Sequence, residues 1–143
     1  MRVMRIDERA VMPTRGSKEA AGRDLYAVCD RPVAIRPQET EVIHTGLVFE
    51  VPQGHFAGIY ARSGMATNRG LRPSNCVGVV DPDYRGEVLV ALYNDSDETQ
   101  IVCNGDRVAQ VIVTKVYDVP FEEVYEVSRT ERGAGGFGST GVK

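Results

Sequence analysis

The distribution of turn residues is the feature that most limits what this chain can fold into. Short segments rich in Val, Ile, Phe and Tyr alternate with Gly, Pro, Asn and Asp, a pattern typical of β-strands joined by tight turns. A single stretch, 63–69, has a helical pattern, with Ser63 as its expected cap and Gly70 at its end. Strands are expected over 33–35, 41–51, 55–61, 77–80, 87–93, 107–117 and 121–127, and turns at 52–54, 82–83 and 104–105.

Many short strands and one short helix favour an all-β sandwich, jelly roll or barrel. The length of 143 residues suits one domain, and a hydrophobic content of 42% is enough for a core. The composition then changes near the C-terminus, where the last dozen residues are rich in glycine.

Charge and cysteine content narrow the functional classes. The net charge of −3 argues against a general nucleic-acid-binding protein, which usually carries a basic excess. Cys29, Cys76 and Cys103 are widely spaced and odd in number, so we expect buried free thiols in a reducing compartment and no zinc site. The sequence has no signal segment and no long apolar run, which predicts a cytoplasmic protein that does not bind membranes. His44 and His55 are expected to be structural.

The segment 132–141 contains five glycines and one aromatic residue. Repeated glycine lets backbone N–H groups turn toward an anion, while Arg132, Ser139 and Thr140 add donors for phosphate. Phe137 is suited to stacking on a flat base. Such a segment should be mobile when no ligand is bound. A disordered glycine-rich tail is the alternative, and the segment alone does not decide between the two.

Other polar residues stand at the ends of apolar strands or inside them. Arg62, Ser63 and Gly64 lie where a strand is expected to run into the helix, a position suited to phosphate. Asp24 precedes an apolar run and suits a magnesium ion that is held through water. Gln110 lies inside a very apolar strand and can donate to a phosphate. The alternatives are an ordinary capped helix, a turn aspartate and a glutamine that satisfies a backbone group.

A further pair of carboxylates, Asp81 and Asp83, is expected at a turn between two apolar strands. A carboxylate held there can orient and deprotonate a water molecule, and the neighbouring Tyr84 can pack against a sugar. The alternative is a solvated hairpin turn, which the sequence Asp-Pro-Asp would serve well.

Taken together, these segments resemble the five motifs of the trimeric dUTPase family. They occur in the family's order and span residues 21–141, almost the whole chain. The five segments are 21–25 (Ala-Gly-Arg-Asp-Leu), 62–64 (Arg-Ser-Gly), 78–86 (Gly-Val-Val-Asp-Pro-Asp-Tyr-Arg-Gly), 105–110 (Gly-Asp-Arg-Val-Ala-Gln) and 132–141 (Arg-Gly-Ala-Gly-Gly-Phe-Gly-Ser-Thr-Gly).

The resemblance implies a distorted jelly-roll fold, with a β domain over 1–130 and a flexible C-terminal lid over 131–143. It implies hydrolysis of dUTP to dUMP and pyrophosphate with Mg²⁺, which limits uracil in DNA and supplies dUMP for thymidylate synthesis. Family members are homotrimers with shared active sites. The first, second and fourth motifs of a site come from one chain, the third from a second chain and the tail from a third.

The resemblance also implies residue roles by position. Asp81 matches the base that activates the water attacking the α-phosphorus, and Asp24 matches the carboxylate that holds the metal through water. Tyr84 matches the ring that packs against the deoxyribose and leaves no room for a 2′-hydroxyl. Asn75, with the backbone of its hairpin as far as Val80, matches the position that reads the uracil edge.

The remaining matched positions bind substrate. Most of them contact phosphate, one stacks on uracil through its ring, and those in the tail belong to the lid. They are Arg62, Ser63, Gly64 and Gln110 for the phosphates, Arg132, Ser139 and Thr140 for the γ-phosphate, Phe137 for stacking, and Gly138 beside it.

The chain departs from the family at one informative position. Ala61 stands where the second motif usually begins with Pro, and the loss of proline is expected to loosen that strand end slightly. Arg23 occupies a variable position and has no predicted role. Two alternatives remain open at this stage, a dCTP deaminase of the same fold and a nucleotide-binding interaction module without catalysis.

Overall fold

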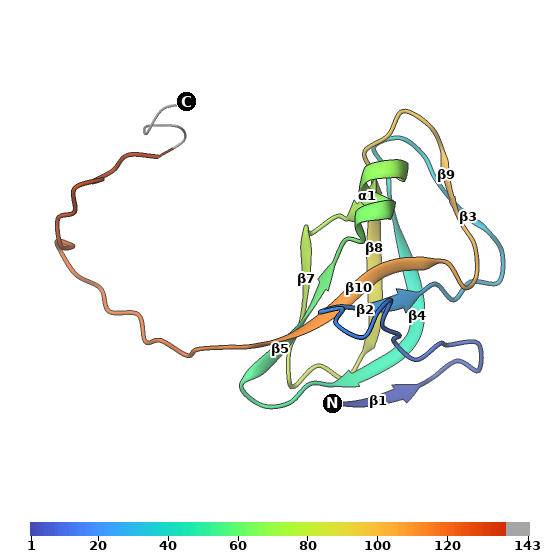
Figure 1. Ribbon diagram of the computed structural model, residues 1–143, viewed down its shortest axis with the longest axis horizontal. Helices are drawn as coiled ribbons and strands as arrows, with labels where there is room; N and C mark the ends of the chain where they lie inside the picture. Colours follow the sequence, from blue (N-terminus) through green and yellow to red (C-terminus); the bar gives the residue numbers. More distant parts are fainter. Residues whose placement is uncertain (137–143) are drawn as a thin grey trace.

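The computed structural model describes residues 1–136 of the chain (Figure 1). These residues form ten strands and one short helix, which confirms the expected all-β class. The elements are β1 (Arg2–Arg5), β2 (Arg23–Tyr26), β3 (Val33–Ile35), β4 (Thr40–Glu50), β5 (His55–Tyr60), α1 (Ser63–Arg69), β6 (Leu71–Pro73), β7 (Val77–Val80), β8 (Glu87–Asn94), β9 (Gln100–Val102) and β10 (Arg107–Lys115).

The strands form two four-stranded sheets and one two-stranded ribbon. One sheet has the order β1-β4-β8-β6, the other has the order β2-β10-β5-β7, and β3 pairs with β9. All of these pairings are antiparallel. The described strands form open sheets, so the fold is the sandwich form of a jelly roll and not a closed barrel.

Apolar side chains from both four-stranded sheets fill one core. Period-2 alternation places them inside, while the intervening residues face outward. In β8, for example, Val88, Val90 and Leu92 are buried and Leu89 is exposed. The core includes Leu25, Ile43, Leu47, Phe49, Ala57, Ile59, Leu71, Val108, Ala109 and Val111.

Asn94 is a fully buried polar residue at the end of β8. Its Nδ2 group donates to the Ile35 and Glu98 carbonyls, both at 2.8 Å. Its Oδ1 atom accepts from the Ser96 backbone N–H at 2.9 Å and from the Ser96 hydroxyl at 2.7 Å. Because every polar atom of this side chain is paired, Asn94 ties the end of β8 to β3 and to the following loop.

The short helix ends as expected but begins differently. Gly70 has φ +65°, and a Cβ at that position would lie 2.8 Å from the Ser96 backbone nitrogen, so glycine is required there. The capping residue is Arg62, and no side chain caps the first turn. The expectation that Ser63 caps the helix is therefore wrong, because Ser63 is already the first helical residue.

Most expected strands are present, within a residue or two at their ends. The last of them, expected over 107–117, ends at Lys115. Strands β1, β2, β6 and β9 were not expected from the sequence. They have three or four residues each, which is too short for an alternating pattern to stand out.

The strand expected over 121–127 is wrong. After Lys115 the chain leaves the sheets and runs outward as an extended arm without regular structure (Figure 1). Phe121 and Tyr125 on this arm are fully exposed. Strand propensity measures how well a residue fits a pleated surface, and no strand among residues 1–136 pairs with the arm.

The structure agrees with only part of what the sequence predicts for the three cysteines. All three thiols are free, as expected. Cys76 and Cys103 are exposed and Cys29 is half-buried, so the expectation that they are buried is wrong. His55 Nδ1 lies 3.0 Å from the Gln53 carbonyl oxygen. The one helix among residues 1–136 is too short to cross a membrane.

Replacing Asn94 with alanine should destabilise the fold by about 1–3 kcal/mol, because buried partners would be left without hydrogen bonds. The free energy of unfolding in urea, compared at one protein concentration, measures this. Asn68→Ala, at an exposed helical position, is the control and should change it by less than about 0.5 kcal/mol. Equal stability of both variants would contradict the assigned role of the Asn94 network.

Candidate active site

Strand β10 lies between β2 and β5 and brings three of the predicted site segments together. In this sheet Gln110 pairs with Asp24 on one side and with Tyr60 on the other. Arg62 follows Tyr60 by two residues, where the chain turns into α1. The segments containing Asp24, Arg62 and Gln110 therefore meet at one end of the sheet, although 86 residues separate Asp24 from Gln110 in sequence.

The contacts in this cluster centre on the carboxylate of Asp24. Arg62 Nε donates to Asp24 Oδ1 at 2.7 Å, and Arg107 Nη1 donates to Asp24 Oδ2 at 3.2 Å. The Asp24 side chain is 14% exposed, whereas that of Arg107 is 50% exposed. Two guanidinium groups around one carboxylate give the trio a formal charge of +1. The cluster is therefore suited to receive another anion.

Gln110 is held on the edge of the same cluster. Its Nε2 group donates to the Ala61 carbonyl at 2.8 Å, so one of its two N–H groups serves the backbone. A Cβ at Gly22 would lie 2.3 Å from Gln110 Oε1, which explains why glycine stands opposite this side chain. Ser63 and Gly64 are exposed at the start of α1, with open space beside Gly64.

The segment predicted to read the base is the turn between β6 and β7, two strands that belong to different sheets, so the expected hairpin is not formed. Asn75 is exposed, and a Cβ at Gly78 would lie 3.4 Å from Asn75 Nδ2. The Asn75 amide therefore lies beside Gly78, against the surface of β7. Val80 is buried, while Asp81 beyond it is exposed at the turn.

Tyr84 is fixed on this turn by two local features. Its hydroxyl donates to the Glu87 carbonyl at 3.0 Å. A Cβ at Gly86 would lie 2.3 Å from the tyrosine oxygen, so the ring lies over a glycine. Tyr84 as a whole is 43% exposed. An exposed ring in a fixed orientation can serve as a flat wall for a ligand.

Within one chain, however, Asp81 does not join the Asp24 cluster. Asp24, Gln110, Tyr60 and Val77 form one row across the sheet. Asp81 comes four residues after Val77, and that displacement is roughly 13 Å along the strand direction. Asp81 therefore lies toward the other end of β7 from the row that contains Asp24.

The described part of the tail, residues 131–136, also lies apart from the cluster. Arg132 is exposed on the arm, and its Nε group donates to the Gly135 carbonyl at 2.8 Å. Figure 1 shows the arm extending away from the sheets. The other predicted tail residues, Phe137, Gly138, Ser139 and Thr140, lie outside the described residues.

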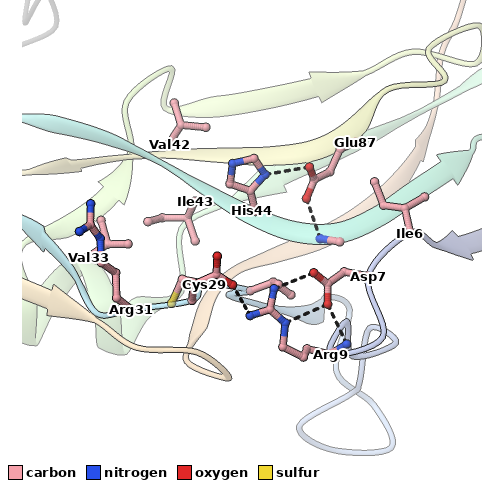
Figure 2. A pocket seen from close by; sticks show the side chains of 13 residues that line it. Ile6, Asp7, Arg9, Cys29, Arg31, Val33, Val42, Ile43, His44 and Glu87 are labelled. Atoms are coloured by element: carbon pink, nitrogen blue, oxygen red, sulfur yellow. Dashed lines mark hydrogen bonds and ion pairs between the residues drawn. The ribbon is translucent and has the colours of Figure 1, made fainter.

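A surface pocket of about 620 Å³ lies elsewhere, between the start of the chain and β4 (Figure 2). Arg9 donates to both oxygens of Asp7, at 3.0 and 2.8 Å, and to Asp30 at 2.7 Å. This pairing lowers the pKa of Asp7 to about 2 and raises that of Arg9. His44 Nδ1 lies 2.8 Å from Glu87 Oε2.

The polar groups of this pocket already serve the fold. Glu87 Oε1 accepts from the backbone N–H groups of Thr45 and Gly46, at 3.1 and 2.7 Å, where the pairing of β4 with β8 shifts register. None of the predicted site residues within 1–136 lines the pocket. The pocket is large, but Asp7, Arg9 and Glu87 already pair with other side chains or with the backbone. We therefore take the Asp24 cluster as the candidate active site.

Arg107 is the member of the cluster for which the sequence predicts no role. It stands inside the fourth segment, three residues before Gln110. In a regular strand, residues three apart face opposite sides, so the alternating pattern places Arg107 away from Asp24. In the sequence, the charge of Arg107 next to Asp106 is the one feature that marks it as a candidate site residue. That feature does not indicate that Arg107 pairs with Asp24.

The sequence of this chain is similar to known proteins over almost its whole length. The sequence model of the dUTPase family matches residues 8–141. A deoxyuridine 5'-triphosphate nucleotidohydrolase of Nautilia profundicola is 43% identical over 141 residues, covering 99% of this chain and 98% of the relative. One from Anaplasma marginale is 42% identical over 131 residues, covering 92% and 89%.

The fold has close counterparts among solved structures. The dUTPase of Staphylococcus bacteriophage 80alpha with dUPNHPP matches with a TM-score of 0.83 and 27% identity, over 99% of this chain and 98% of the phage chain. The agreement covers the sheets that carry the Asp24 cluster and nearly the full sequence of each relative. The chain therefore belongs to the dUTPase family of enzymes.

Proposed function

We propose that the chain hydrolyses dUTP to dUMP and pyrophosphate by attack of water on the α-phosphorus. The observation that carries this proposal is the convergence of Asp24, Arg62 and Gln110, from three distant segments, on one positively charged cluster. The reaction would limit uracil in DNA and supply dUMP for thymidylate synthesis. The free thiols are consistent with a cytoplasmic location.

The proposal includes a homotrimer in which each active site is shared. Asp81 and Arg132 lie away from Asp24 in a single chain, so a complete site requires these groups from other copies. Closed three-fold symmetry supplies them equally to every site. The exposed apolar residues of the arm, such as Tyr117, Phe121 and Tyr125, support this assembly because they need a surface to cover them.

Within this assembly, residues 1–130 are the β domain and 131–143 are a lid. The phosphates bind to Arg62, Ser63, Gly64 and Gln110. The lid closes over the nucleotide, excludes bulk water and adds contacts to uracil and the γ-phosphate, from Arg132, Phe137, Gly138, Ser139 and Thr140.

Catalysis needs in-line positioning of water and cancellation of charge more than covalent help. Asp81 is the proposed general base, and such assistance contributes about 10²–10⁴-fold. The Asp81 carboxylate, exposed at its turn, can hold the water by accepting a hydrogen bond from it. Arg62 supplies fixed positive charge to the phosphates throughout the reaction.

The cluster is suited to hold Mg²⁺ through a metal-bound water and not by direct coordination. Among residues 1–136, no group of three or more His, Cys, Asp and Glu side chains could hold a metal directly. Mg²⁺ commonly keeps several waters and binds through substrate phosphates and one or two carboxylates. Asp24, with both oxygens already bonded but with acceptor capacity left, suits contact with a metal-bound water. When bound, the ion would neutralise charge on the triphosphate.

Selectivity for dUTP rests on the turn that carries Asn75 and on Tyr84. Cytosine presents a different hydrogen-bond pattern from uracil, so a pocket built for the uracil edge leaves polar groups unpaired with cytosine. The backbone as far as Val80 forms the rest of that edge and leaves no room for the methyl group of thymine. The fixed ring of Tyr84 excludes the 2′-hydroxyl of UTP.

Pyrophosphate release from dUTP, UTP, dTTP and dCTP, each with Mg²⁺ and with a chelator, tests the proposal. We expect strong release from dUTP alone and reduced release after chelation. Ammonia release from dCTP would instead identify a deaminase of the same fold. A folded protein that binds dUTP without any release would identify an interaction module.

Tyr84→Ala should raise the turnover of UTP relative to dUTP, by roughly tenfold or more in the ratio of kcat/KM values, because the wall against the 2′-hydroxyl is removed. Tyr84→Phe is the matched control, since it keeps the ring and loses only the bond to Glu87. It should retain most of the discrimination. An unchanged ratio in Tyr84→Ala would remove this residue from sugar selection.

Deleting residues 132–143 should leave the trimer intact and lower kcat/KM for dUTP by roughly 100-fold or more, because the lid and its phosphate contacts are lost. Light scattering measures the assembly, and pyrophosphate release measures the activity. Full activity in the truncated protein would refute the lid. A monomeric product would show that the deleted residues also hold the trimer together.

A further inference from the structure

The pairing of β10 with β2 contains an irregularity at the candidate site. Arg107 pairs with Tyr26 and Ala109 pairs with Leu25, so Val108 is an extra residue on β10. Such a β-bulge changes which face the residues before it point to. Both Val108 and Ala109 are buried, as expected when alternation is interrupted.

The bulge determines where Arg107 lies. Tyr26 and Asp24 are two residues apart and share one face of β2, and they are paired with Arg107 and Gln110, respectively. The extra residue therefore brings Arg107 and Gln110 to the same face, although they are three residues apart. Without the bulge the Arg107 side chain would point away from Asp24.

In this position Arg107 makes two contacts to the cluster. Its guanidinium donates to Asp24 Oδ2 at 3.2 Å. Its backbone carbonyl accepts from Arg62 Nη1 at 3.3 Å. Because Arg62 Nε also donates to Asp24 Oδ1, the two arginines and the aspartate are linked at three points.

These contacts leave much of the Arg62 guanidinium available. Arginine has five N–H donors, and within residues 1–136 Arg62 uses one on Nε and one on Nη1. Three donors remain, including both on Nη2. Arg62 is thus held at both Nε and Nη1, and the edge that carries Nη2 is free for an anion.

We propose that Arg107 is a positioning residue, which holds the Asp24 carboxylate so that Arg62 presents its free edge to the phosphates of the substrate. This inference rests on the proposed function. Arg107 occupies Asp24 Oδ2, so Asp24 engages Arg62 through Oδ1 alone. With Oδ2 released, Asp24 can turn and bind Arg62 through two parallel hydrogen bonds, the geometry that arginine and carboxylate favour. Such a pair uses donors that the phosphates need.

The test compares binding of dUpNHpp, which carries phosphates, with binding of deoxyuridine, which does not, by calorimetry on the full chain with Mg²⁺. Arg107→Met should weaken dUpNHpp binding about tenfold, the effect of losing one charged hydrogen bond, and leave deoxyuridine binding unchanged. Arg107→Lys keeps a cation beside Asp24 and should remain within about threefold of the wild type. Equal losses for both ligands, or no loss for either, would overturn the proposal.

Arg23→Met is the matched control. Arg23 is an exposed arginine on the same strand pair, next to Asp24 in sequence and therefore on the other face of β2. Its removal changes the net charge equally and should alter neither affinity. A tenfold loss of dUpNHpp binding in Arg23→Met would assign the effect to overall charge and refute positioning by Arg107.

A double-mutant cycle separates positioning from direct contact. If Arg107 acts through Asp24, Arg107→Met should change dUpNHpp binding by less than about twofold in an Asp24→Asn background. A tenfold loss in both backgrounds would show that Arg107 contacts the phosphates itself. This comparison measures binding only. It therefore still tests the role of Arg107 if the wild-type protein binds dUpNHpp but releases no pyrophosphate from dUTP. That result would overturn the proposed hydrolysis without deciding the role of Arg107.

Discussion

The pairing of β10 with both β2 and β5 is the interaction on which the rest of this structure depends. One side of β10 contributes Val108, Ala109 and Val111 to the core, and the backbone bonds fix its register against two neighbours. Because register in an antiparallel sheet determines which side chains are opposite one another, the same pairing that buries the core also sets Asp24 beside Gln110 and the start of α1.

Ion pairs hold the resulting cluster together. A single carboxylate, Asp24, lies between two guanidinium groups and leaves the trio with one positive charge in excess. A largely buried carboxylate is stabilised by such partners, and the excess charge favours an anionic ligand. The same contacts that stabilise Asp24 therefore create a local positive charge, although the protein as a whole is acidic.

A single chain does not bring all the predicted site residues together. The turn with Asp81 and the described part of the arm, with Arg132, lie away from Asp24, and the arm exposes aromatic residues that no other part of residues 1–136 covers. Apolar surface left exposed in this way favours association with another copy. Close contacts complete the local geometry. Gly22 leaves space for Gln110, and Gly86 leaves space for the ring of Tyr84.

The sequence by itself determined the all-β class, the longer strands, the end of the helix at Gly70 and the segments that carry polar chemistry. These features follow from local preferences, namely alternation, turn chemistry and the left-handed conformation that glycine tolerates. Tertiary structure alone decided which residues meet. The alternating pattern places Arg107 on the wrong face, because the bulge at Val108 arises from pairing with β2. It also suggests a strand over 121–127, because propensity does not say whether a partner strand exists. Contacts between distant residues depend on register and bulges, and these are properties of paired strands that no single segment of the sequence contains.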